Sequence, residues 1–141
     1  MTRYMDGWML PALDESNRDF FTRAKIVVRE CAACGTIQHP PEDLCHACGG
    51  YEFGGREVAG VGTVYSHTVV EHPVHPDLSA HVPYTVVLVS LDELPDVRIV
   101  GNLLETATDD VRVGLPVRAV WEEIPDAETE ETIRLPQWVP A

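Results

Sequence analysis

Positive charge is scarce in this chain of 141 residues. Lys25 is the only lysine, and together with nine arginines it is set against 23 aspartates and glutamates, so the formal net charge is −13. Affinity for nucleic acids depends on neutralising phosphates with Lys and Arg, and attraction to anionic lipids needs the same cations. The composition therefore argues against binding to nucleic acids or to an anionic membrane surface.

Long apolar runs are also lacking. The first residues, Met1–Trp8, do not form the apolar core of a signal peptide, and no run is long enough to span a bilayer. We therefore expect a cytoplasmic protein, in a compartment that keeps thiols reduced. The hydrophobic content of 45% is that of a globular protein with one modest core or two small units.

Cysteine is limited to four residues, but their spacing is informative. They form two C-x-x-C pairs, Cys31 with Cys34 and Cys45 with Cys48, each followed by glycine and separated by ten residues. Two thiolates from one tight turn hold one face of a tetrahedral ion, and the second turn closes the other face. Because four thiolates leave no open coordination position, the spacing predicts a structural zinc ribbon.

Two other interpretations of the cysteines remain at this point. A pair of disulfides would need an oxidising compartment. Iron in a rubredoxin-like site would use the same four ligands, and a colourless protein carrying one zinc would exclude it. His39 and His46 lie near the cysteine turns, but four sulfurs already fill the coordination shell, so we expect both imidazoles to be exposed and without a ligand role.

A helix and a strand are predicted ahead of the cysteines. Asp14–Ala24 is typical of a short helix with Asp14 or Ser16 as its N-cap. Residues 26–30 are branched and apolar at first, which predicts a strand leading into the first cysteine turn. The preceding segment, residues 1–11, would be an arm that packs on its own domain or lies across a partner.

Beyond the cysteines the pattern is that of a β-barrel. Glycine pairs bracket a short returning strand at residues 51–53, which favours a domain boundary near Gly54. A short helical turn is predicted at residues 108–113, between the third and fourth of five strands. The five strands are predicted at residues 57–70 (bent at Gly60 and Gly62), 84–91, 98–104, 117–123 and 133–139.

These elements predict a mainly β protein. Residues 1–54 would hold the N-terminal arm, the helix and a rubredoxin-like zinc ribbon. Residues 55–141 would form a five-stranded OB-fold barrel with a C-terminal tail, because five strands, a bent first strand and a small connector are typical of that fold.

Histidines gather around the loop that joins the first two barrel strands. Their spacings fit no defined metal-ligand pattern, so contact with a partner or ligand is favoured over a second metal site or acid–base catalysis; they are His67, His72, His75 and His81. No nucleophile elbow or catalytic pair is visible, and the cysteines are assigned to metal. We therefore expect no catalytic residue in this chain.

The order of motifs is specific enough to name a family. The chain resembles the zinc-ribbon/OB-fold family associated with acyl-CoA metabolism, long catalogued as a domain of unknown function, over nearly its whole length. The motifs, in order, are Arg29-Glu30-Cys31-x-x-Cys34-Gly35, Pro40-Pro41, Cys45-x-x-Cys48, Gly60-x-Gly62-Thr63-Val64-Tyr65-Ser66, Pro83-Tyr84, Gly101-Asn102-Leu103 and Val113-Gly114-Leu115-Pro116-Val117.

This resemblance implies a non-catalytic accessory subunit. Members of the family accompany thiolase-superfamily proteins, including thiolases, acetyltransferases and retro-aldolases that shorten steroid side chains held as CoA thioesters; some work beside hotdog-fold enoyl-CoA hydratases. The resemblance thus implies a hetero-oligomer with a thiolase-like protein, in which this chain binds the partner and helps form the acyl-CoA site. The chemistry, C–C bond cleavage or acyl transfer, would belong to the complex.

Motif position also implies which residues meet the ligand. Tyr65, His67 and Tyr84 would face the pantetheine or acyl group, unless the tyrosines are instead core or hydrogen-bonded strand residues. The family commonly has arginine after the proline pair, whereas this chain has Glu42. CoA phosphates need Arg or Lys, so the partner would supply that charge.

A different class of function remains as the alternative. Zinc ribbons and OB-folds both occur in nucleic-acid-binding modules, and the acidic charge is the main observation against that function here.

Overall fold

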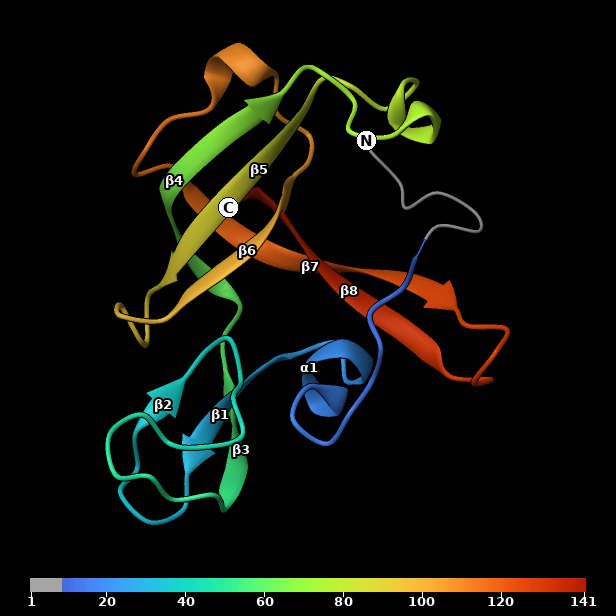
Figure 1. The fold of residues 1–141 in the computed structure, drawn as a ribbon. Coiled ribbons are helices and arrows are strands. Elements are labelled where there is room, and N and C mark those ends of the chain that lie inside the picture. The colour runs from blue at the N-terminus through green and yellow to red at the C-terminus, as the bar shows by residue number, and fades with distance from the viewer. Residues whose placement is uncertain (1–8) are drawn as a thin grey trace. The chain divides into compact units, whose positions relative to one another are not determined.

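The computed structural model describes residues 9–141, which fold into two compact units. One unit contains the described part of Gly7–Gly60 together with Trp121–Pro136, and we call it the ribbon unit. The other contains Val61–Val120 and Gln137–Ala141, and we call it the barrel unit. Figure 1 shows the strands of both units. Most of the predicted N-terminal arm lies outside the described residues.

The ribbon unit is built on a three-stranded antiparallel sheet in the order β2-β1-β3 (Figure 1). Its strands are β1 (Ile26–Cys31), β2 (Ile37–Gln38) and β3 (Phe53–Val58). β3 pairs with the whole of β1, from Val58 opposite Ile26 to Phe53 opposite Cys31. The returning strand is therefore longer than predicted, because it continues through the second glycine pair.

The predicted strand over residues 57–70 is wrong at its beginning. Glu57 and Val58 belong to β3, and a new strand, β4, begins at Val61. The reason is that Val58 is buried opposite Ile26 in the ribbon sheet, so the apolar pattern of residues 57–70 serves two different sheets. Alternation alone does not show at which residue a strand changes partner.

The helix α1 (Arg18–Thr22) is shorter than the predicted Asp14–Ala24. The Asp14 carboxylate accepts hydrogen bonds from the backbone N–H groups of Ser16 at 2.8 Å and Asn17 at 3.1 Å. It thus stabilises a turn ahead of the helix, whereas the N-cap Asn17 makes no side-chain cap. Asp and Ser side chains favour such local turns over helix.

This short helix is held by a segment far away in the sequence. The Arg134 guanidinium donates to the Thr22 carbonyl at 2.7 Å, and Arg18 forms an ion pair with Glu131. Both partners lie in the Trp121–Pro136 segment of the ribbon unit. A five-residue helix is unstable by itself in water, so these contacts and the buried Phe20 fix it in place.

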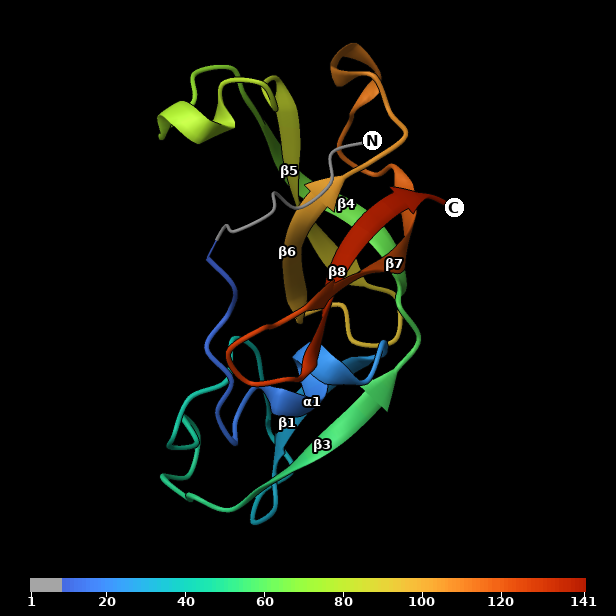
Figure 2. The same ribbon diagram turned by 90° about the vertical axis from the view of Figure 1, so that its right-hand side faces the viewer.

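The barrel is closed, with strand order β4-β5-β6-β8-β7. β7 meets β4 at Val61–Thr63 and closes the barrel, and β6 runs parallel to β8 with Leu103 opposite Trp138. Figure 2 shows β8 beside β6 and β7. The bounds are β4 (Val61–Val70), β5 (Tyr84–Leu91), β6 (Arg98–Leu103), β7 (Pro116–Pro125) and β8 (Thr132–Pro140). The prediction of a mainly β protein with a five-stranded barrel is confirmed.

The barrel core follows from period-two alternation along its strands. β5 alternates regularly, with Thr85, Val87, Val89 and Leu91 buried and the residues between them half-buried. Trp138, 0% exposed, is the largest fully buried side chain among the described residues. Two 3-10 turns lie in the connections, η1 (Pro76–Leu78) after β4 and η2 (Thr108–Asp110) after β6. The second is the predicted connector between the third and fourth barrel strands.

Among the described residues, no helix has both the length and the apolar character needed to cross a membrane.

Candidate functional site

The two cysteine turns bring four sulfurs together in the ribbon unit. Within each turn the first cysteine carbonyl accepts the N–H of the following glycine, Gly35 at 2.9 Å and Gly49 at 2.8 Å. Both glycines have φ of 75°, a left-handed conformation that is strained for other residues. This confirms why glycine follows each pair, and the repeated turn gives the two pairs the same shape.

The sulfur geometry matches a tetrahedral metal site. The Sγ atoms of Cys31 and Cys48 are 3.7 Å apart, those of Cys34 and Cys45 are 3.6 Å apart, and all four lie within 4.8 Å of one another. Zn–S bonds of about 2.3 Å in a regular tetrahedron place sulfurs about 3.8 Å apart. All four cysteines are free thiols, not disulfides, and they are positioned to bind a metal ion.

The pKa values of the clustered thiols also favour a bound cation. The Thr36 hydroxyl, 3.1 Å from Cys34 Sγ, lowers the pKa of Cys34 to about 6. The Gly50 N–H lowers the pKa of Cys48, but interactions with the sulfurs of Cys34 and Cys31 outweigh it and raise that pKa to about 12. Four adjacent sulfurs thus do not all ionise alone, whereas a divalent cation deprotonates a coordinating thiol.

One residue that joins the turns was missed by sequence reasoning. Gln38, buried at the end of β2, donates from Nε2 to the Leu44 carbonyl at 3.1 Å. Its Oε1 accepts the backbone N–H of His46 at 2.7 Å. Both ends of one amide therefore hold the second cysteine turn, and no sequence signal distinguishes this glutamine from an ordinary strand residue.

The prediction that both ribbon histidines are exposed is wrong for one of them. His46 is exposed, but His39 is mostly buried, with its ring 5.1 Å from the Phe20 ring of α1. Burial lowers the pKa of His39 to about 4. His39 therefore acts as a neutral packing residue between the ribbon and α1.

A polar cavity of about 560 Å³ lies beside the ribbon sheet. Its walls include the carboxylates of Glu15, Asp19 and Glu52 and the guanidinium of Arg29. Arg29 stacks on the Phe53 ring at 4.1 Å. The charged side chains among its lining residues make the cavity a poor site for an apolar acyl chain.

The barrel unit presents a second feature, a partly exposed sheet face. The outward residues of three neighbouring strands form rows across this face, and we call it the outer face of β4–β5–β6. The rows are Thr63–Ser90–Arg98, Ser66–Leu88–Val100, Thr68–Val86–Asn102 and Val70–Tyr84, with Tyr65 added at a bulge in β4. None of these residues is an aspartate or a glutamate.

The structure places two of the three predicted ligand residues on this face. Tyr65 is 51% exposed, and the Arg98 guanidinium lies 4.0 Å above its ring. Tyr84 lies opposite Val70 at the far end of the face. The two tyrosines are about four residues apart along the strands, which is roughly 13 Å. Neither is a core residue, so each is accessible to a ligand or partner.

His67 is not brought together with them. It lies opposite Val87, whose side chain points into the barrel, so His67 belongs to the other face of β4 and is nevertheless exposed. The loop that follows carries His75, whose Nδ1 accepts the Asp77 N–H at 3.2 Å. Within the described residues, the four cysteines form the one cluster that could hold a metal ion.

Comparison with known proteins identifies both units. Residues 22–53 match the rubredoxin-like zinc ribbon domain of ChsH2, and residues 55–122 match the C-terminal OB-fold domain of ChsH2. A solved chain from the "Ltp2-ChsH2(DUF35) aldolase" superposes with a TM-score of 0.74 at 38% identity, covering 93% of this chain and 98% of that one. The chain belongs to the ChsH2 (DUF35) family. The resemblance inferred from the motifs is confirmed.

Curated relatives of this DUF35 chain are named for acyl-CoA enzymes and for scaffolding. The "Probable enoyl-CoA hydratase alpha subunit" of Thermomonospora curvata is 39% identical over 93% of this chain. A "DUF35 domain-containing scaffold protein" of Methanocaldococcus jannaschii is 33% identical over 67% of the chain. The "3-oxo-4,17-pregnadiene-20-carboxyl-CoA hydratase alpha subunit" of Mycobacterium tuberculosis is 33% identical over 67%.

The chain spans less than two thirds of the length of these curated relatives. The matched regions cover 39%, 65% and 29% of the three proteins, respectively. The match to the solved aldolase chain is different, because it spans nearly all of both chains.

Proposed function

We propose that this chain is a non-catalytic accessory subunit of a thiolase-superfamily enzyme, a thiolase or retro-aldolase, that acts on acyl-CoA thioesters. Steroid side-chain degradation is the proposed setting. The observation that carries the proposal is the match over nearly the full length to the DUF35 chain of an aldolase. The names of the curated relatives, all subunits or scaffolds, support it.

We propose that the four cysteines bind one structural zinc ion. The donor set and the S···S distances of 3.6 and 3.7 Å suit zinc, whose bound state would supply folding energy and no open coordination site. Cys34→Ser should lose the metal and unfold the ribbon unit, whereas Ala33→Ser, one residue away and exposed, should retain both. Elemental analysis and the absence of visible absorption distinguish zinc from iron, and a folded Cys34→Ser protein with full metal content would contradict the ligand assignment.

The net charge of the chain suggests which subunit binds the phosphates of CoA. CoA carries several phosphates, which proteins bind with Arg and Lys. This chain has net charge −13 and a single lysine, so the partner supplies the phosphate-binding groups. The barrel unit then supplies part of the wall around the pantetheine or acyl group through Tyr65 and Tyr84, whereas the proposed third residue, His67, lies on the other face of β4 and does not share that wall.

Recovery of the native complex tests the proposed function. The full chain is expressed with an affinity tag in its source cells, and the recovered partner is identified by mass spectrometry. A thiolase-like protein should be recovered in stoichiometric amount, and acyl-CoA turnover should require both proteins. A partner that is soluble and fully active alone, or turnover by this chain alone, would contradict the proposal.

Substrate kinetics of the assembled complex test the proposed ligand residues. Tyr84→Leu should raise KM for the acyl-CoA several-fold while the complex still assembles, because the aromatic contact with the ligand is lost. Tyr51→Leu is the matched control, since Tyr51 is 77% exposed in the ribbon unit. An unchanged KM in the Tyr84 variant would remove that residue from the site.

Two relatives favour a second candidate, a hydratase complex. Both are named hydratase alpha subunits, and one shares 39% identity with this chain. The same recovery experiment separates the candidates, because the identity of the partner and the reaction it catalyses differ. A nucleic-acid-binding module is the remaining alternative, and a salt-dependent gel shift with single-stranded DNA would support it.

A further inference from the structure

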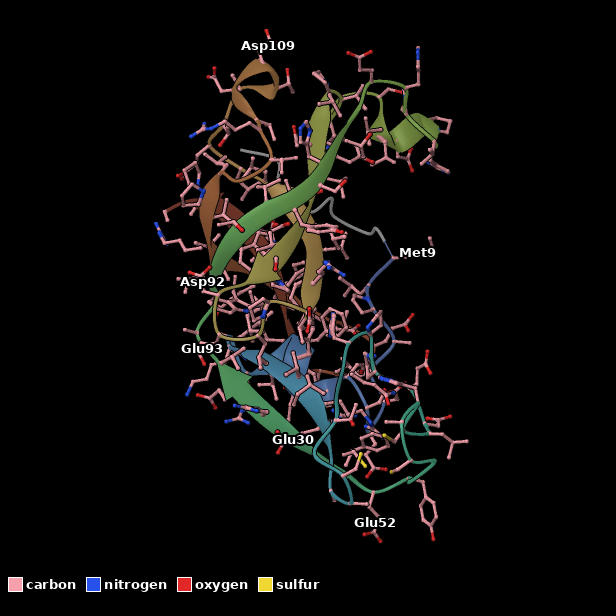
Figure 3. All side chains as sticks on the ribbon, turned by 90° about the vertical axis from the view of Figure 1, so that its left-hand side faces the viewer. Met9, Glu30, Glu52, Asp92, Glu93 and Asp109 are labelled. Carbon is pink, nitrogen blue, oxygen red and sulfur yellow. The ribbon has the colours of Figure 1, made fainter. Side chains whose placement is uncertain are left out.

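We propose that Cys48 is the metal ligand that peroxides oxidise first, and that a disulfide between Cys48 and Cys31 then releases the metal from the ribbon unit. This inference rests on the proposed zinc site, because it concerns four thiolates held by one ion. It adds a modification site, the class of its oxidant and the order in which the sulfurs react. Figure 3 shows sulfur atoms, in yellow, gathered in the part of the ribbon unit that carries the labelled Glu30 and Glu52.

Two of the four cysteines are open to solvent. Cys34 and Cys48, the second cysteine of each turn, are exposed, whereas Cys31 is 2% exposed and Cys45 is 3% exposed. In a zinc site all four sulfurs are thiolates, so solvent access and intrinsic nucleophilicity decide which sulfur an oxidant attacks. The first oxidation therefore falls on one of the two exposed sulfurs.

The first turn protects its exposed sulfur through Thr36, the second residue after Cys34. The Thr36 hydroxyl lies 3.1 Å from Cys34 Sγ, and the Thr36 backbone N–H donates to the same sulfur. A metal-bound thiolate has no proton, so the hydroxyl is the donor in this contact. Donated hydrogen bonds withdraw charge from a thiolate and lower its nucleophilicity.

The equivalent residue of the second turn is Gly50, which has no side chain. Its backbone N–H donates to Cys48 Sγ at 3.4 Å. A Cβ atom at this position would lie 3.2 Å from Cys48 Sγ and 3.5 Å from Cys31 Sγ, so glycine leaves this side of both sulfurs free of a side chain. Cys48 thus receives one hydrogen bond where Cys34 receives two, and it is the more nucleophilic of the exposed sulfurs.

The reaction balances with a peroxide, such as hydrogen peroxide, as the oxidant. The Cys48 thiolate attacks one peroxide oxygen: the S–O bond forms, the O–O bond breaks and hydroxide leaves, so the sulfur is oxidised to a sulfenic acid and the peroxide is reduced. The Cys31 thiolate, with its Sγ 3.7 Å from that of Cys48, then attacks the oxidised sulfur. The S–S bond forms, the S–O bond breaks and a second hydroxide leaves. Two of the four ligands are lost, so the ribbon unit releases the metal.

Alkylation of the full zinc-loaded chain with substoichiometric iodoacetamide ranks the exposed sulfurs. The reagent is uncharged, so the net charge of −13 does not bias its approach. Digestion after glutamate separates the two turns into residues 31–42 and 43–52, and mass spectrometry quantifies the label in each. Cys48 should be labelled several-fold more than Cys34.

Substitutions at the two equivalent positions exchange the difference between the turns. Thr36→Val removes the hydroxyl and should raise the labelling of Cys34 toward that of Cys48. Thr36→Ser is the matched control, because it keeps the hydroxyl and should react as the wild type does. Gly50→Thr copies the first turn onto the second and should slow the labelling of Cys48 several-fold. Zinc content and melting temperature verify that each variant is folded and loaded.

Hydrogen peroxide added to the same zinc-loaded chain tests the second step. Zinc should be released, as followed with a coloured zinc indicator, while residues 31–42 become joined to residues 43–52 by the Cys31–Cys48 disulfide. A thiol reductant with added zinc should restore the zinc content and the melting temperature.

The outcomes separate this inference from the proposed zinc site. A purified chain that binds no zinc refutes the metal site, and the inference with it. In a zinc-loaded chain, labelling of Cys34 equal to or above that of Cys48 refutes the inference alone, as does equal labelling of Cys34 in the Thr36→Val and Thr36→Ser variants. A disulfide confined to residues 43–52, or zinc retained after oxidation, would overturn the second step.

Discussion

Gln38 connects strand β2 to the second cysteine turn through both ends of its amide. Its hydrogen bonds to the Leu44 carbonyl and the His46 N–H hold the second turn in register with the first. Gln38→Ala leaves these two backbone groups without a partner, so we expect the free energy of unfolding to fall by about 1–3 kcal/mol. Chemical denaturation measures the change.

The neighbouring histidine gives the control for this prediction. The side chain of His46 is exposed, so His46→Ala should change stability by less than about 0.5 kcal/mol. If Gln38→Ala changed the free energy of unfolding equally little, the amide would not be supporting the metal-binding turns.

His39 predicts a pH dependence of stability. Burial lowers the pKa of His39 from 6.5 to about 4. Between these two pH values, the unfolded chain therefore binds a proton on His39 and the folded chain does not. The associated stability is therefore fully present above pH 6.5 and is lost as the pH falls toward 4. For this single group we expect a loss of about 2 kcal/mol between pH 7 and pH 5.

A substitution isolates this histidine from other acid effects, including loss of metal. His39→Phe keeps a ring against Phe20 but has no proton to gain, so its stability should decline less steeply between pH 7 and pH 5. Denaturant titrations at both pH values measure the difference. Parallel declines in the two proteins would show that His39 does not contribute.

Among single residues, the sequence predicts the metal ligands better than the residues that hold the metal-binding turns in place. The four cysteines are recognisable because each turn is local and its spacing is fixed by the geometry of the ion. Gln38 and His39 are not recognisable, because their partners are chosen by the fold: one reaches the second cysteine turn and the other reaches Phe20.

Among the elements, the close pairing of β4 with β5 depends on Gly62. A Cβ atom at this position would lie 2.2 Å from the Ser90 carbonyl oxygen and 2.8 Å from Val89 Cγ1. The clash is with the backbone of the paired strand β5, which cannot move without loss of the ladder. Gly62→Ala should therefore destabilise the barrel by several kcal/mol, on the scale of severe overpacking.

Another strand glycine provides the comparison. A Cβ atom at Gly54 in β3 would meet nothing within 4 Å, so Gly54→Ala should leave stability nearly unchanged or slightly increased. Thermal unfolding of both variants measures the contrast. Equal melting temperatures would show that β4 and β5 can separate at this point without cost.

Elements with a regular period were predictable, and those that depend on distant partners were not. β5 alternates without interruption and was predicted with its observed bounds, Tyr84–Leu91. β3 was divided wrongly because its pairing with β1, and not its own composition, determines where it ends. α1 is held by Arg134, which lies 112 residues from the Thr22 carbonyl that it binds.

For the whole molecule, motif order predicted the fold and the family, while the composition of the barrel surface became visible only with the structure. The outer face of β4–β5–β6 is assembled from strands separated by loops, and its lack of acidic residues is visible only when the register is known.

The central claim is that this chain serves the chemistry of another protein. The direct test is acyl-CoA turnover by the purified thiolase-like partner, measured alone, with this zinc-loaded chain, and with the chain alone. Turnover is expected only when both proteins are present. Full activity of the partner by itself, or turnover by this chain without it, would contradict the account.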